Sequence, residues 1–133
     1  MREEYKMDEM SELFEKGLQI RKEVLGAEYV DRAIENATEF TMPLQEFVTS
    51  YAWGAIWGRD GLDRKTRSFL NLAMLTALNR QTELGLHVRG ALRNGITVDE
   101  IREVLLQAGV YVGVPAAIEA FRTAERVINE ELA

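Results

Sequence analysis

Residues 63–95, DRKTRSFLNLAMLTALNRQTELGLHVRGALRNG, predict two consecutive helices that set the fold class of the chain. Asp63 is suited to cap a first helix over residues 64–79, because its side-chain oxygen can accept a hydrogen bond from a first-turn backbone N–H. Apolar residues leave that helix almost no polar face, which is typical of a buried central helix. A second helix is predicted over residues 81–94, and Gly95 follows it where glycine often ends a helix.

Helical patterns continue on both sides of this pair. Before it, we expect helices up to Leu25, over residues 28–36, and from Pro43 to about residue 58. After it, Thr97 and Glu100 have the spacing of a capping box, and a last helix starts near residue 113. Sustained period-2 alternation, the mark of half-buried strands, is nearly absent. The sequence therefore predicts one all-α domain over residues 1–133, a bundle of six or seven helices.

Two helices carry more apolar surface than one face can bury in so small a domain. Trp53 and Trp57 form one such face, separate from an apolar face that includes Phe47 and Tyr51. An excess of this kind indicates a subunit interface or a pocket. The two tryptophans are therefore either core or interface residues, or the wall of a pocket. The last helix is expected to bury a stripe made of Ile118, Phe121, Ala124 and Ile128.

The composition excludes several classes of function. The formal net charge of −6 makes the chain a poor candidate for binding nucleic acid. No apolar run approaches the ~20 residues that span a membrane, and the charged N-terminus precedes no signal core, so we expect a cytoplasmic protein. The chain has no cysteine, which excludes disulfides, thiolate metal sites and cysteine nucleophiles.

His87, the one histidine of the chain, is the candidate for acid–base chemistry. Arg80, Glu83 and His87 are spaced by three and four residues, which places them on one helical stripe. A carboxylate four residues from an imidazole can orient it and raise its pKa, giving a proton donor near neutrality. The alternative is a structural histidine beside a surface pair, with Arg89 simply exposed to solvent. A metal site is not indicated, because one histidine and one glutamate fall short of the usual ligand number.

Ten blocks along residues 11–130 carry a family resemblance. They are residues 17–21, 24–26, 45–48, 51–59, 61–68, 72–78, 83–84, 87–92, 94–95 and 110–117. These blocks resemble the 4-carboxymuconolactone decarboxylase family. The resemblance implies the alkylhydroperoxidase-like fold, usually assembled as homotrimers or homohexamers. It also implies a cofactor-free reaction of the β-ketoadipate pathway, in which 4-carboxymuconolactone from protocatechuate, an aromatic compound, loses CO₂ and becomes the β-ketoadipate enol-lactone.

The peroxidase branch of that superfamily carries the motif Cys-x-x-Cys-x-x-x-His. When its histidine is placed on His87, its two cysteines fall on Arg80 and Glu83. The thiols are therefore replaced by a cation and a carboxylate, and thiol peroxidase chemistry is excluded because no sulfur nucleophile remains.

The resemblance also suggests roles for the residues of this stripe toward a small dianionic lactone. His87 would deliver the proton or donate a hydrogen bond to the oxyanion, and Glu83 would orient it. Arg80, with Arg89 as a second candidate, would bind a substrate carboxylate, while Trp57 would form an apolar wall against the leaving carboxylate. Two alternatives stay open: a lyase or isomerase of a related small lactone, and a non-catalytic helical oligomer that binds a metabolite.

Overall fold

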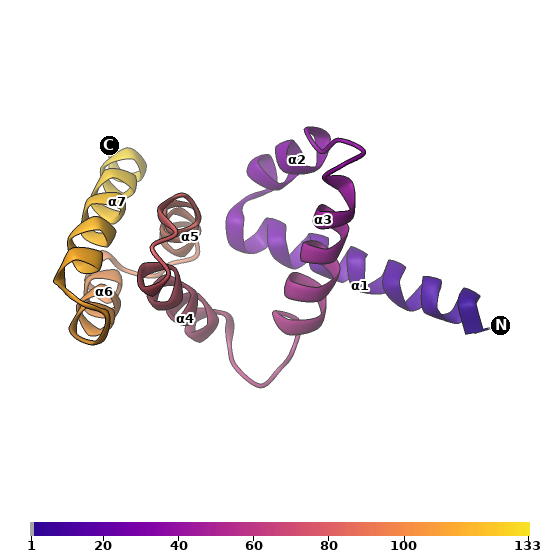
Figure 1. The fold of residues 1–133 in the computed structure, drawn as a ribbon, viewed down its shortest axis with the longest axis horizontal. Coiled ribbons are helices and arrows are strands. Elements are labelled where there is room, and N and C mark those ends of the chain that lie inside the picture. Colours follow the sequence, from indigo (N-terminus) through magenta and orange to yellow (C-terminus); the bar gives the residue numbers. More distant parts are fainter. Residues whose placement is uncertain (1) are drawn as a thin grey trace. The chain divides into compact units, whose positions relative to one another are not determined.

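The computed structural model describes residues 2–133, with side chains from Glu12 onward, and this part of the chain is helical without strands (Figure 1). The all-α prediction is thereby confirmed, with seven α-helices. They are α1 (Arg2–Leu25), α2 (Ala27–Glu35), α3 (Met42–Phe47), α4 (Arg64–Ala77), α5 (Gln81–Arg93), α6 (Val98–Val112) and α7 (Val114–Leu132), and a π-helical segment, η1 (Val48–Ile56), continues α3. None of the described helices is long and apolar enough to cross a membrane.

The chain divides into two compact units, Met1–Gly61 and Leu62–Ala133. Each unit has a hydrophobic cluster of its own. We call them the N-terminal unit and the C-terminal unit and describe each by itself. The single domain expected over residues 1–133 stays a prediction.

In the N-terminal unit, α1 packs closely against η1. A Cβ added at Gly17 would lie 1.8 Å from the backbone oxygen of Thr49, and one at Gly54 would lie 2.4 Å from that of Leu13. Any larger residue would therefore push the two helices apart. The buried cluster of this unit consists of Ile20, Val24, Leu25, Val30, Trp53 and Trp57.

The single helix expected from Pro43 to about residue 58 is wrong in its second half, which is π-helical. The backbone N–H of Trp57, for example, donates to the oxygen of Ala52, five residues earlier, at 2.9 Å. Each wider turn rotates the following side chains relative to an α-helix, which a 3.6-residue period cannot anticipate. Trp53 and Trp57 consequently lie in the core of the unit, with ring centroids 4.7 Å apart.

The exposed apolar surface of this unit lies elsewhere. Leu44, Phe47 and Tyr51 are each 57–58% exposed, whereas both tryptophans are buried. The interpretation of the tryptophans as core residues is confirmed, and the expectation that their face carries the apolar excess is wrong.

The C-terminal unit is built from α4 to α7, with α5 packed against α4 and α7, and α6 packed against the same two helices. The predicted caps are confirmed. Asp63 accepts a hydrogen bond from the Thr66 N–H at 2.8 Å, and Thr97 and Glu100 form both bonds of the capping box. Its core cluster is Leu72, Leu84, Val88, Ala91, Ile96, Ile101, Leu105, Ala120, Ala124 and Val127.

One burial prediction for this unit is wrong and another holds in part. Helix α4 is not buried all round, because its neighbours cover only the side that holds Leu72 and Thr76, and Leu78 is 68% exposed. In α7, Ala124 is buried and Phe121 and Ile128 pack against the core as predicted, whereas Ile118 is exposed and the fully buried residues are Ala120 and Val127. Small residues let α7 approach α5 closely, so its most apolar side chains are not its most buried ones.

Candidate functional site around His87

Helix α5 supplies three of the five site residues that the sequence suggested, and His87 lies at its centre. Leu84, Val88 and Ala91 on the same helix are buried in the core of the C-terminal unit, which fixes how α5 is rotated. His87 is half-buried, and its Nδ1 atom is shielded from solvent. The imidazole is therefore held at the edge of a packed core.

Burial sets the electrostatics of His87. It lowers the pKa of the imidazole to about 4, although the carboxylate of Glu83 acts in the opposite direction. The expectation of a pKa near neutrality is therefore wrong, because desolvation of the cation outweighs the attraction of Glu83. At pH 7 the free protein holds a neutral imidazole, in which one ring nitrogen donates and the other accepts.

Glu83 and Arg80 lie toward the start of α5. Glu83 is in the first turn, where a negative charge is favoured by the helix dipole, and its side chain is exposed. Arg80 is the residue before the helix, and its carbonyl oxygen accepts the first hydrogen bond, from the N–H of Leu84. The side chain of Arg80 is exposed. The structure thus places Glu83 where its charge acts on His87 and leaves Arg80 at the surface. The roles suggested for Glu83 and Arg80 stay predictions.

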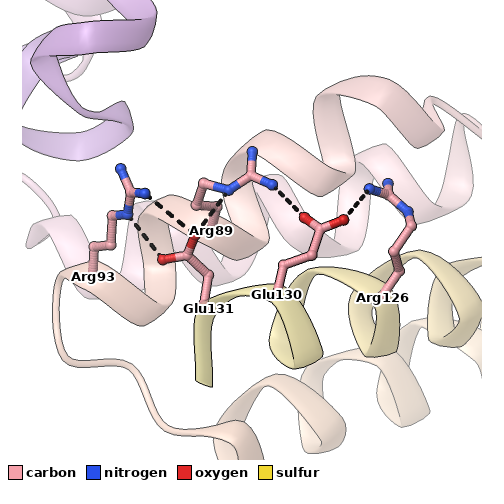
Figure 2. A network of polar contacts seen from close by, with 5 residues as sticks. All are labelled: Arg89, Arg93, Arg126, Glu130 and Glu131. Carbon is pink, nitrogen blue, oxygen red and sulfur yellow. Dashed lines mark hydrogen bonds and ion pairs between the residues drawn. The ribbon is translucent and has the colours of Figure 1, made fainter. Parts of the chain in front are cut away.

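Arg89 lies on a different side of α5, because two residues turn an α-helix by about 200°. Its Nη2 donates to Glu130 at 2.8 Å and its Nε to Glu131 at 3.1 Å, both on α7 (Figure 2). Arg93 and Arg126 join the same network through these glutamates. Arg89 is therefore a link between α5 and α7, and it is neither simply exposed nor free to bind a carboxylate without exchanging partners.

Trp57 belongs to the N-terminal unit, where it is buried and stacked against Trp53. Its role as an apolar wall stays a prediction.

The C-terminal unit also has a groove, which lies apart from the suggested site residues. The groove, of about 500 Å³, lies between α4 and α6; its lining includes Phe69, Leu70 and Val104, and Glu103 contributes a carboxylate. None of the five suggested residues lines that groove. Among residues 12–133, no three histidine, aspartate or glutamate side chains gather in a way that could hold a metal ion.

Sequence reasoning missed one buried polar cluster, formed by Arg21, Gln45 and Thr49 in the N-terminal unit. An arginine on the apolar face of a helix was the available signal, because charged side chains are rarely fully buried.

Comparisons with known proteins agree with this architecture. The model of the carboxymuconolactone decarboxylase family matches residues 43–126. A nitrosuccinic acid decarboxylase of Metarhizium robertsii is 52% identical over 89% of this chain and 82% of its own length. A 4-carboxymuconolactone decarboxylase of Acinetobacter baylyi is 42% identical over 88% of this chain and 87% of its own. An uncharacterized 15.0 kDa protein of Paracoccus denitrificans is 33% identical, over 93% and 96% of the two chains. The chain belongs to the carboxymuconolactone decarboxylase family.

Proposed function

We propose that this chain is a cofactor-free decarboxylase of a small dicarboxylate that carries its own electron acceptor. The observation that carries the proposal is the pair Glu83–His87: a half-buried imidazole under the influence of a carboxylate, on a helix of the family domain. Two relatives that align with most of this chain are named decarboxylases.

The first candidate substrate is 4-carboxymuconolactone, as the sequence suggested, in the protocatechuate branch of the β-ketoadipate pathway. Its leaving carboxylate is attached next to a C=C bond that is conjugated with the lactone carbonyl. When the C–C bond breaks, CO₂ departs and the electron pair moves onto the lactone oxygen as a dienolate. A proton added to the carbon next to the carbonyl gives the enol-lactone.

Nitrosuccinate is a second candidate, favoured by the higher identity to the nitrosuccinic acid decarboxylase, 52% against 42%. In that compound the carbon that loses CO₂ also bears the nitro group. The electron pair moves onto the nitro oxygens as a nitronate, and a proton then returns to carbon. Both candidate substrates are dianions. In both reactions negative charge develops on an oxygen as CO₂ leaves, and one proton is then added to carbon. The same protein groups could therefore catalyse either reaction.

His87 would act in two ways. With substrate bound, a ring N–H donates a hydrogen bond to the developing oxyanion, and such a donor lowers the barrier by roughly 3–4 kcal/mol. A dianion bound beside the ring favours the imidazolium, so substrate binding raises the pKa of His87 and Glu83 adds to the effect. The protonated ring then delivers the proton to carbon.

Arg80 is the stronger candidate for binding a substrate carboxylate. It is exposed, whereas Arg89 already holds Glu130 and Glu131. A planar guanidinium binds a carboxylate through two parallel hydrogen bonds.

Assembly into a homotrimer or homohexamer is part of this proposal. Phe47, Tyr51, Met74, Leu78 and Tyr111 are exposed apolar side chains, each more than half exposed. Large exposed apolar surfaces usually mark interfaces between proteins. A cytoplasmic location fits an enzyme of small-molecule breakdown.

Turnover of both substrates tests the proposal. The protein, shown to be folded by circular dichroism, is given 4-carboxymuconolactone generated in situ or nitrosuccinate, and CO₂ release is followed. We expect release well above the uncatalysed rate with at least one of them, and the ratio of kcat/KM values identifies the better substrate. Release at the uncatalysed rate with both would contradict the proposal.

A further inference from the structure

Arg21 is a buried cation whose partners in the structure are all neutral. The side chain lies on α1 and is only 5% exposed. Its Nη1 donates to the amide oxygen of Gln45 at 2.8 Å and to the hydroxyl of Thr49 at 3.2 Å. The phenol of Tyr29 also acts on the guanidinium, and burial lowers the pKa of Arg21 overall. Buried charges are normally paired with an opposite charge, and among the residues whose side chains are described Arg21 has no such partner.

The guanidinium keeps one unpartnered donor for a compensating group, and the phenol of Tyr29 also hydrogen-bonds to it. Both side-chain hydrogen bonds of Arg21 to Gln45 and Thr49 use Nη1, and Nε is a buried donor without a hydrogen-bond partner among the described residues. Nε and Nη2 together form the edge that binds a carboxylate through two parallel hydrogen bonds. Gln45 and Tyr29 are only half-buried, so the cluster extends to the surface of the N-terminal unit.

The backbone holds this cluster in a fixed position. Thr49 is fully buried at the start of η1, and its carbonyl lies against Gly17 of α1 in the close approach of the two helices. Gln45 lies one turn earlier on α3. Short π-helical segments recur at functional sites, where they place a side chain that a regular helix would turn away.

We propose that Arg21, with Gln45 and Thr49, forms a carboxylate-binding site for a small dicarboxylate. The choice of ligand rests on the proposed function. Arg21 supplies the charge and the bidentate edge, and the two neutral side chains hold the guanidinium in place without neutralising it. If an aspartate or glutamate stood at position 45 or 49, its own carboxylate would pair with Arg21 and block the binding of a ligand.

Binding of succinate, an unreactive dicarboxylate, tests this inference on the full-length protein. Isothermal titration and thermal unfolding would compare the parent with Arg21→Met and Arg21→Lys, and Arg32→Met is the matched control because Arg32 is an exposed arginine of the same unit. We expect succinate to bind the parent and the control, to raise their Tm, and to bind both Arg21 variants roughly tenfold to a hundredfold more weakly. Neutral succinamide should bind none of them.

Stability separates a binding role from a structural one. Arg21→Met removes an uncompensated buried charge, so its Tm without succinate should equal or exceed that of the parent. Should Arg21→Met fail to fold, Arg21→Lys keeps the charge but lacks the bidentate edge and still decides the question. Succinate binding that is absent from the parent, or unchanged in Arg21→Lys, would overturn the inference. Succinate binding that depends on Arg21, in a protein that decarboxylates neither candidate, would leave the inference standing and the proposed function refuted.

Discussion

The carboxylate of Glu83 and the imidazole of His87 lie one turn apart on α5, and their attraction does not make His87 a cation in the free protein. Burial of the ring is the larger effect and keeps its pKa at about 4. The acid–base pair is therefore set to respond to a further negative charge, such as that of a bound dianion.

The stability of the protein should fall as the pH drops from about 6.5 to about 4 because of His87. The unfolded chain binds a proton on this histidine below its ordinary pKa of 6.5, whereas the folded protein resists protonation until about pH 4. The full shift corresponds to at most about 3 kcal/mol. Urea unfolding between pH 7 and pH 4.5 measures it. His87→Gln should show a flatter dependence in this range, and equal slopes in the two proteins would argue against the depressed pKa.

Glu83→Gln should lower the pKa of His87 below its parental value. The substitution removes the attraction of the Glu83 carboxylate, which raises this pKa, and leaves the burial of the ring in place. Because Glu83 is exposed, the fold should be unaffected. Proton NMR of the single histidine follows the titration directly. An unchanged midpoint would show that Glu83 does not act on His87.

Arg80→Met and Arg89→Met should have opposite consequences. Arg80 is exposed beside the helix start, so its loss should raise KM and leave Tm unchanged. Arg89 links α5 to Glu130 and Glu131 of α7, so its loss should lower Tm and leave KM nearly unchanged. Steady-state kinetics and thermal unfolding of the two variants make the comparison. The reverse pattern would place Arg89 in the substrate site.

The ion pairs of Glu131 with Arg89 and Arg93 should also make the stability of the protein depend on pH, in addition to the effect of His87. Hydrogen bonds from Arg93, and then from Arg89, hold the pKa of Glu131 below its ordinary value of 4.5. Its contribution to stability is therefore present above pH 4.5 and is lost as the pH falls further. Glu131→Gln should lose that part of the acid dependence. Added salt screens the ion pairs, so it should lower the stability of the parent to nearer that of the variant. A salt-independent difference between the two proteins would exclude an electrostatic cause.

Gly17→Ala should destabilise the protein by at least about 1–3 kcal/mol, the cost of overpacking a well-filled contact. Its Cβ would lie 1.8 Å from the backbone oxygen of Thr49, which cannot move without shifting η1. Gly61→Ala is the matched control, since no atom lies within 4 Å of the added Cβ and its φ is not positive. Chemical denaturation of both variants measures the difference. Equal stabilities would contradict the close packing of α1 and η1.

The helix limits could be predicted because their causes are local. Asp63 caps α4, the pair Thr97–Glu100 caps α6, and Gly95, with a φ of 88°, follows α5, each as the neighbouring residues indicated. The π-helical half of the segment after Pro43 could not be predicted, because it depends on how η1 packs against α1.

The electrostatics of the candidate site were harder to predict, because they depend on distant residues and on burial. Spacing along α5 places Glu83 near His87 but says nothing of how deeply the ring is buried, which decides its pKa. The link from Arg89 to Glu131 joins residues 42 positions apart, a separation that no local pattern reveals.

Single-turnover release of CO₂ by the parent and by His87→Gln tests whether His87 is the proton donor. Both proteins are mixed in excess with the better of the two candidate substrates, and release is followed at pH 7. We expect rapid release by the parent and a rate roughly 10²–10⁴-fold lower for the variant, with the fold and succinate binding retained. Release at the parental rate by a folded His87→Gln protein would contradict the assignment of His87 as the proton donor.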